Sequence, residues 1–141
     1  MSPAHGLILF AHGARDARWA APFEAVATRV RAARPDVLVR LAFLEFMSPD
    51  LAGAGTELVA AGCAHITILP MFLGAGGHVR KDLPLLLEGL RRRWPEAGFD
   101  LLTAIGEVDS VMQAMADAAV RAVVAAVGVG GMNKPDEDPS A

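Results

Sequence analysis

Four short apolar stretches alternate along the chain with longer segments of helical periodicity, and this alternation constrains the fold more than any other feature. Leu7 to Phe10 is an unbroken apolar run, which is typical of a strand buried on both faces. The other strand candidates are residues 37–45, 65–69 and 99–105, and the helix candidates are residues 16–34, 48–61, 82–94 and 108–127. Repeated strand–helix units predict an α/β fold, a three-layer α/β/α domain with a four-stranded parallel sheet.

Capping residues and helix breakers predict where several of the helices begin and end. Asp16 and Ser48 are candidate N-caps for the first two helices, and Gly62 is a candidate stop for the second. Asp82 is the candidate N-cap of the third helix. It would place Pro84 in the first turn, where proline is tolerated.

Length and composition limit the organisation of the chain and the partners it can have. The 141 residues suit one domain over residues 1–127, and the residues from 128 to 141, rich in glycine, proline and acid, predict a disordered tail. The net charge of −3 gives no basic footprint, so we expect no nucleic-acid partner.

Cysteine usage and hydropathy indicate a cytoplasmic protein. The single cysteine, Cys63, cannot form an internal disulfide or a multi-cysteine metal site, and this fits a reducing compartment. We find no signal-peptide pattern. The longest apolar run, Ala122 to Met132, is about half of the roughly 20 residues that a membrane span needs. We therefore expect no membrane partner.

Three side chains with metal-binding chemistry follow three different predicted strands. His12 ends the first run in LILFAHGARD, Glu45 ends the second, and His78 follows a glycine-rich turn after the third in ITILPMFLGAGGHVRKDLP. The carboxyl ends of parallel strands share one edge of the sheet, where open α/β sheets bind ligands. Two imidazoles and a carboxylate suit a borderline divalent cation such as Co²⁺, Fe²⁺, Ni²⁺ or Zn²⁺. Each histidine taken alone also fits a loop residue bonded to backbone.

The glycine turn GAGG, residues 74–77, matches neither the dinucleotide fingerprint nor the Walker A pattern. It fits a flexible strand-to-helix turn, or a close approach of the Gly76 and Gly77 backbone to a ligand. Arg15, Arg80 and Lys81 would add positive charge at this edge for an acidic ligand. They equally fit a solvated surface.

These segments together resemble the small class II chelatases of the sirohydrochlorin cobaltochelatase and ferrochelatase group, the CbiX and SirB type. The similarity runs from about Leu7 to Glu107, and its most specific part is the GGHVRKDLP stretch. The family's metal-handling residues fall on His12, Glu45 and His78. One departure is Ala14, where the family usually has serine.

The resemblance implies ATP-independent insertion of Co²⁺, or next Fe²⁺, into sirohydrochlorin, in cobalamin or sirohaem biosynthesis. It implies catalytic and metal-binding roles for His12, Glu45 and His78. It also implies substrate-binding roles for Arg15, Arg80, Lys81, Gly76 and Gly77. The divalent metal is then a substrate, no organic cofactor is expected, and the short chain is expected to form a homodimer.

Two other functions compete with metal insertion as interpretations of these residues. Histidine phosphatases also have a histidine–glycine pair after the first strand, but their nucleophilic histidine follows an arginine, and here Ala11 holds that position. A non-catalytic carrier of metal or tetrapyrrole has the same residue requirements as a chelatase, and it stays open as the alternative.

Overall fold

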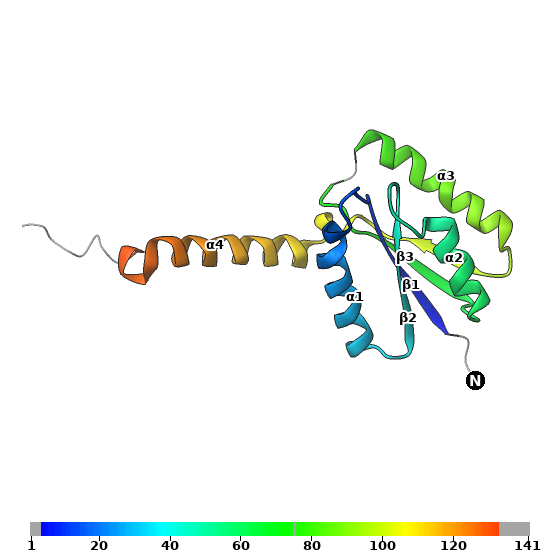
Figure 1. The fold of residues 1–141 in the computed structure, drawn as a ribbon, viewed down its shortest axis with the longest axis horizontal. Coiled ribbons are helices and arrows are strands. Elements are labelled where there is room, and N and C mark those ends of the chain that lie inside the picture. The colour runs from blue at the N-terminus through cyan, green and yellow to red at the C-terminus, as the bar shows by residue number, and fades with distance from the viewer. Residues whose placement is uncertain (1–3, 75, 133–141) are drawn as a thin grey trace, which may run out of the picture. The chain divides into compact units, whose positions relative to one another are not determined.

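The computed structural model describes residues 4–74 and 76–132, and for His78 and residues 129–132 it describes the backbone alone. Four parallel strands form one sheet: β1 (His5–Ala11), β2 (Val37–Phe43), β3 (His65–Pro70) and β4 (Gly98–Leu101). Their order across the sheet is β2-β1-β3-β4. The predicted four-stranded parallel α/β fold is therefore confirmed (Figure 1).

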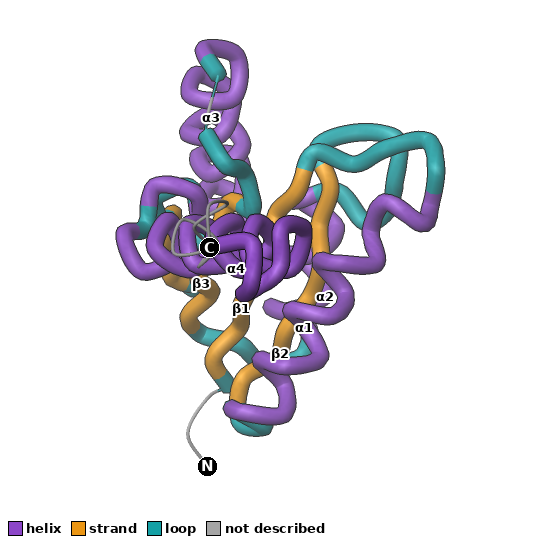
Figure 2. The backbone as a smooth tube through the Cα atoms, turned by 90° about the vertical axis from the view of Figure 1, so that its left-hand side faces the viewer, coloured by secondary structure: helices purple, strands orange, loops and turns teal. Residues whose placement is uncertain are grey.

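Three helices cover the two faces of this sheet. They are α1 (Ala21–Ala33), preceded by a 3₁₀ turn at Ala17–Ala20, α2 (Leu51–Ala60) and α3 (Gly77–Arg93). Figure 1 shows α1 on one side of the strands and α2 with α3 on the other. In Figure 2 the strands run side by side, and the loops that follow them gather at one end.

The larger core fills the face covered by α2 and α3. Ile8, Phe10, Ile66 and Ile68 of the central strands are fully buried there. Leu58 of α2, Leu83, Leu87 and Leu90 of α3, and Phe99 of β4 complete the same cluster. Burial on this scale stabilises the fold by roughly 1.5–3 kcal/mol per large side chain. The opposite face packs Leu9 and Val39 against Ala27 of α1.

Two helix starts differ from their predicted positions. The α2 helix begins at Leu51 with Asp50 as its N-cap, and the side chain of Asp50 accepts a hydrogen bond from the Gly53 N–H at 2.8 Å. Ser48 is thus not the cap. The α3 helix begins at Gly77, so Asp82 and Pro84 both lie inside it. Packing of Val79, Leu83 and Leu87 on the core outweighs the backbone hydrogen bond that Pro84 cannot donate.

Other boundaries agree more closely with expectation. Asp16 caps the 3₁₀ turn by accepting from the Arg18 N–H, and Gly62 adopts a φ of 94° just after α2, as a C-terminal stop does. The fourth strand ends at Leu101 rather than at Ile105, and a 3₁₀ turn follows at Ile105–Glu107. Leu86 of α3 is 39% exposed, whereas its neighbour Leu87 is buried.

The chain divides into two compact units between Gly106 and Glu107. The second unit contains α4 (Asp109–Met132), whose helical backbone is interrupted at Gly128 (φ 75°, ψ 159°), one residue after the expected end at Val127. The remaining residues of the predicted tail, 133–141, lie outside the described residues. The single domain over residues 1–127 stays a prediction.

By length and composition, α4 passes the usual test for a membrane span. The stretch Asp109–Gly128 has a mean hydropathy of 1.4. The apolar run expected from Ala122 onward is therefore part of a longer apolar segment, which extends towards the N-terminus across Asp117 and Arg121. One such helix is weak evidence for a membrane, because a packed helix of a globular protein meets the same criterion.

Candidate functional site

The order of the strands reverses between β1 and β3, and this is where the candidate site lies. The chain passes from β1 outward to β2, then crosses back to β3. In open α/β sheets such a switch point leaves a crevice outside the carboxyl ends of the two central strands. His12 follows β1, and Phe72 follows β3.

The imidazole of His12 rests against the ring of Phe72. The ring centroids are 4.2 Å apart and the planes are inclined by 33°. Phe72 is 2% exposed, whereas His12 is exposed. A packed aromatic ring therefore supports one side of an imidazole whose other side is open to solvent.

Backbone hydrogen bonds hold Glu45 beside His12. The parallel register of β1 and β2 ends at Ala11 and Phe43. Two further bonds continue it into the loops: Leu44 N–H donates to the Ala11 carbonyl at 2.9 Å, and Glu45 N–H donates to the His12 carbonyl at 3.0 Å. The sheet thus fixes the separation of these two backbones.

Gly13 makes this close approach possible. Its φ is 89°, in the left-handed region that favours glycine, and a Cβ built there would overlap the carbonyl oxygen of Glu45. The glycine of the histidine–glycine pair is therefore required by the neighbouring loop as well as by its own backbone conformation.

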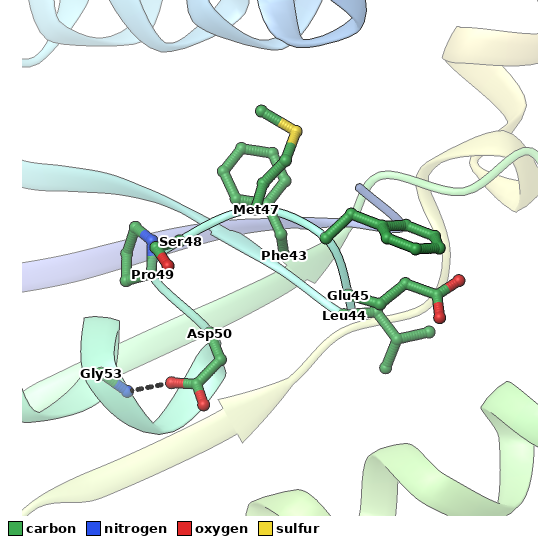
Figure 3. Close-up of a pocket in the computed structure, with 9 residues that line it drawn as sticks. Phe43, Leu44, Glu45, Met47, Ser48, Pro49, Asp50 and Gly53 are labelled. Carbon is green, nitrogen blue, oxygen red and sulfur yellow. Dashed lines mark hydrogen bonds between the residues drawn. The ribbon is translucent and has the colours of Figure 1, made fainter. Parts of the chain in front are cut away.

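The loop that carries Glu45 borders an open hollow of about 500 Å³ between β2 and α2. Figure 3 shows the side chains of Phe43 and Met47 on one side of this loop and those of Leu44 and Glu45 directed elsewhere. Phe43 and Met47 belong to the core cluster under the 3₁₀ turn. The loop is therefore fixed on one side by apolar packing, while Glu45 is exposed.

Phe46, next to Glu45, is a residue that the sequence analysis did not single out. Its φ is 67° and its side chain is 58% exposed. The guanidinium carbon of Arg15 lies 5.1 Å from the centre of its ring, within the range of a cation–π contact. In the sequence, the position of Phe46 directly after the candidate acid Glu45 was the feature that could have indicated a role at the site.

A second cation near Arg15 has a different partner. Arg18 forms a 2.8 Å ion pair with Asp16. The side-chain hydrogen bond from Arg18 lowers the pKa of the Asp16 carboxyl, with a smaller contribution from the Arg18 backbone N–H. Asp16 is therefore negatively charged at neutral pH, and Arg18 supplies the opposite charge of the ion pair.

The glycine turn after β3 leads directly into α3. Gly76 is the N-cap in extended conformation, Gly77 is the first helical residue, and His78 follows in the first turn. The side chain of His78 lies outside the described residues. Arg80 and Lys81 are exposed on the same helix, and the Arg80 N–H donates to the Gly76 carbonyl at 3.0 Å.

The described part of the site brings His12 and Glu45 together by backbone geometry. Among the described side chains, which do not include that of His78, no group of three or more metal-binding residues is arranged to hold an ion. The set of His12, Glu45 and His78 stays a prediction. The fold and the geometry define an open-sheet α/β domain with a candidate ligand site at its switch point.

Comparison with known families identifies the family of this domain. The chain belongs to the CbiX family, whose profile matches residues 6–122. A sirohydrochlorin cobaltochelatase of Saccharolobus solfataricus is 42% identical over 50 residues, 36% of this chain and 39% of that protein. A sirohydrochlorin cobaltochelatase of Sulfurisphaera tokodaii is 29% identical over 87 residues, 62% of this chain and 71% of that protein. The match thus spans well under two thirds of the first relative's length.

Solved structures share the fold. A CbiX protein from Marinobacter aquaeolei VT8 superposes with a TM-score of 0.74 at 30% identity, over 84% of this chain and 97% of that one. The sirohydrochlorin chelatase SirB from Bacillus subtilis in complex with cobalt gives a TM-score of 0.64 at 23% identity, over 79% of this chain and 47% of SirB. The CbiX and SirB resemblance is therefore confirmed.

Proposed function

We propose that this chain inserts a divalent metal, Co²⁺ first and Fe²⁺ next, into sirohydrochlorin without ATP. The observation that carries the proposal is the fixed pairing of His12 and Glu45 at the carboxyl edge of the sheet. Membership of the CbiX family and relatives named sirohydrochlorin cobaltochelatases give the substrate class. The cobalt complex of SirB supports a divalent metal as the second substrate.

The reaction must replace two pyrrole N–H protons by a metal ion that has shed its water. His12 and His78 would bind the incoming ion through a nitrogen lone pair of each imidazole. Glu45 would either complete the coordination or accept a pyrrole proton. Both roles use the exposed carboxylate beside His12.

Cations and backbone would bind the rest of the substrate. Arg15, Arg80 and Lys81 would pair with the peripheral carboxylates of the tetrapyrrole, because guanidinium and ammonium groups form charge-assisted hydrogen bonds with them. Gly76 and Gly77 would allow the ring to approach the backbone at the start of α3. A Cβ at either glycine would meet no atom of the described residues within 4 Å, which leaves space there.

We also propose a homodimer located in the cytoplasm, with no nucleic-acid or membrane partner. The matched region covers 47% of the SirB chain, so two copies of this chain would supply the length of one SirB. The absence of a paired cysteine in the sequence supports a reducing compartment.

The test is an anaerobic spectral assay of the purified chain with sirohydrochlorin and either Co²⁺ or Fe²⁺. We expect multiple turnovers with the wild type, and a loss of 100-fold or more in His12→Ala and His78→Ala, on the scale of lost catalytic groups. His5→Ala is the matched control, since His5 lies at the opposite edge of the sheet, hydrogen bonded to Thr67 at 2.9 Å.

Two results would contradict the proposal. A spectral change that stops at one equivalent per site would indicate a carrier of metal or tetrapyrrole. Wild-type insertion rates in both His12→Ala and His78→Ala would remove these histidines from metal delivery.

A further inference from the structure

We propose that Phe46 is a substrate-binding residue, whose ring supports one face of the tetrapyrrole and holds Arg15 ready for one of its carboxylates. This inference rests on the proposed function and adds to it a residue and a binding surface. Phe46 directly follows Glu45 and lines the hollow between β2 and α2.

The first observation is exposure. Phe46 is 58% exposed, although the flanking Phe43 and Met47 pack in the core beneath the same loop. Isolated exposed aliphatic residues are common on protein surfaces. A large aromatic ring held open beside an ionisable pair is a feature of binding surfaces, where it offers a flat apolar face.

The second observation is the backbone. The φ of 67° is an outlier for a bulky residue, and such outliers gather at functional sites. The turn is held from both ends, because Met47 N–H donates to the Glu45 carbonyl at 2.8 Å and Glu45 N–H donates to His12. Glycine would satisfy this conformation without strain, so the conformation alone does not account for phenylalanine here.

The third observation is the partner of the ring. Arg15 lies over it at 5.1 Å and follows His12 by three residues. The contact keeps a guanidinium at the edge of the site without neutralising its charge. Its planar donors match a carboxylate in a two-point hydrogen bond.

These features together select one ligand class. A bare metal ion gains nothing from an exposed phenyl ring, and a small anion would need Arg15 alone. A flat macrocycle that carries carboxylates uses both the ring face and the guanidinium. The pair of Phe46 and Arg15 therefore fits the tetrapyrrole rather than the metal.

The experiment measures binding of metal-free sirohydrochlorin to the full chain by absorbance titration, with steady-state insertion kinetics alongside. For Phe46→Ala we expect about 10-fold weaker tetrapyrrole binding and a matching rise in KM for sirohydrochlorin. The KM for Co²⁺ should stay unchanged. Phe46→Tyr should restore binding, and Val26→Ala, at an exposed apolar position on α1, should behave as wild type.

A double-mutant cycle tests the contact with Arg15. If the ring positions Arg15, Arg15→Gln should weaken tetrapyrrole binding in the wild type and have a smaller effect in the Phe46→Ala background. Strictly additive effects would overturn the positioning of Arg15, and wild-type binding in Phe46→Ala would overturn the inference as a whole. Thermal unfolding of each variant separates a binding defect from misfolding.

The outcomes distinguish this inference from the proposed function. If the wild type binds sirohydrochlorin without turning it over, the insertion activity fails and the binding data still decide the role of Phe46. If the wild type inserts metal and Phe46→Ala keeps its substrate affinity, the inference alone fails. A wild type that does not bind sirohydrochlorin would overturn both.

Discussion

The backbone N–H of Glu45 donates a hydrogen bond to the carbonyl oxygen of His12 over 3.0 Å. The bond extends the β1–β2 ladder past the last paired residues, Ala11 and Phe43. The backbones that carry an imidazole and a carboxylate from distant parts of the sequence are thereby set at a separation that the sheet dictates. A site placed on rigid elements in this way loses little freedom when a ligand binds.

Gly13→Ala is expected to break this arrangement. The new methyl would overlap the Glu45 carbonyl oxygen, and alanine would also be strained at a φ of 89°. We expect a loss of roughly 2–4 kcal/mol in the free energy of unfolding and of nearly all metal insertion. Urea unfolding and the spectral assay measure the two effects.

Gly62→Ala is the matched control for that variant. Gly62 has a similar φ of 94°, but a Cβ there would meet no described atom within 4 Å. We expect a loss of about 1 kcal/mol, from backbone strain alone, and unchanged activity. Equal losses in the two variants would show that the contact with Glu45 adds no constraint.

Leu90→Ala tests the packing of α3 on α2. Leu90 is 3% exposed and approaches Gly55 so closely that a Cβ there would lie 2.8 Å from its Cδ2. Truncation should lower the free energy of unfolding by about 2–5 kcal/mol through lost burial and a cavity. Leu85→Ala on the same helix, where Leu85 is 67% exposed, should change it by about 0.5 kcal/mol or less. Comparable losses at both positions would contradict the predicted difference.

Cys63 should resist thiol reagents in the folded protein. It is 3% exposed, and burial raises the pKa of its thiol, against a smaller opposing effect of the Arg40 charge. Because the thiolate is the reactive form, we expect slow labelling at neutral pH and fast labelling in denaturant. Labelling at the same rate in both conditions would place the thiol at the surface.

Asp36 should make the stability of the fold depend on acid pH. A side-chain hydrogen bond from Arg34 lowers the pKa of the Asp36 carboxyl to about 2. The folded pKa lies below the unfolded one, near 3.9, so this stabilisation is present above about pH 4 and is lost as the pH falls towards 2.

Asp36→Asn removes that contribution at every pH. The difference in the free energy of unfolding between wild type and variant should therefore be largest near pH 7 and shrink at pH 3, as followed by urea unfolding. It should be small throughout, since both partners are well exposed. A difference that grew in acid would have the wrong sign for this pair.

Local sequence signals predicted much of the fold. The apolar run at Leu7–Phe10 predicted a strand, and the helical spacing after Asp16 predicted a helix. Both segments adopt the structure that their own periodicity favours. The start of α3 was not predictable in this way. Asp82 and Pro84 read locally as a helix start, whereas packing of Val79 and Leu83 on the core extends the helix back to Gly77.

The sequence by itself determined the order of strands and helices and the positions of His12 and Glu45 at strand ends, because both follow from short-range periodicity and chain direction. The tertiary structure decided that β1 lies between β2 and β3, that Glu45 bonds to His12, and that Phe46 is held open under Arg15. Which strands become neighbours depends on burying whole faces of the sheet, a balance among distant segments that no local pattern encodes.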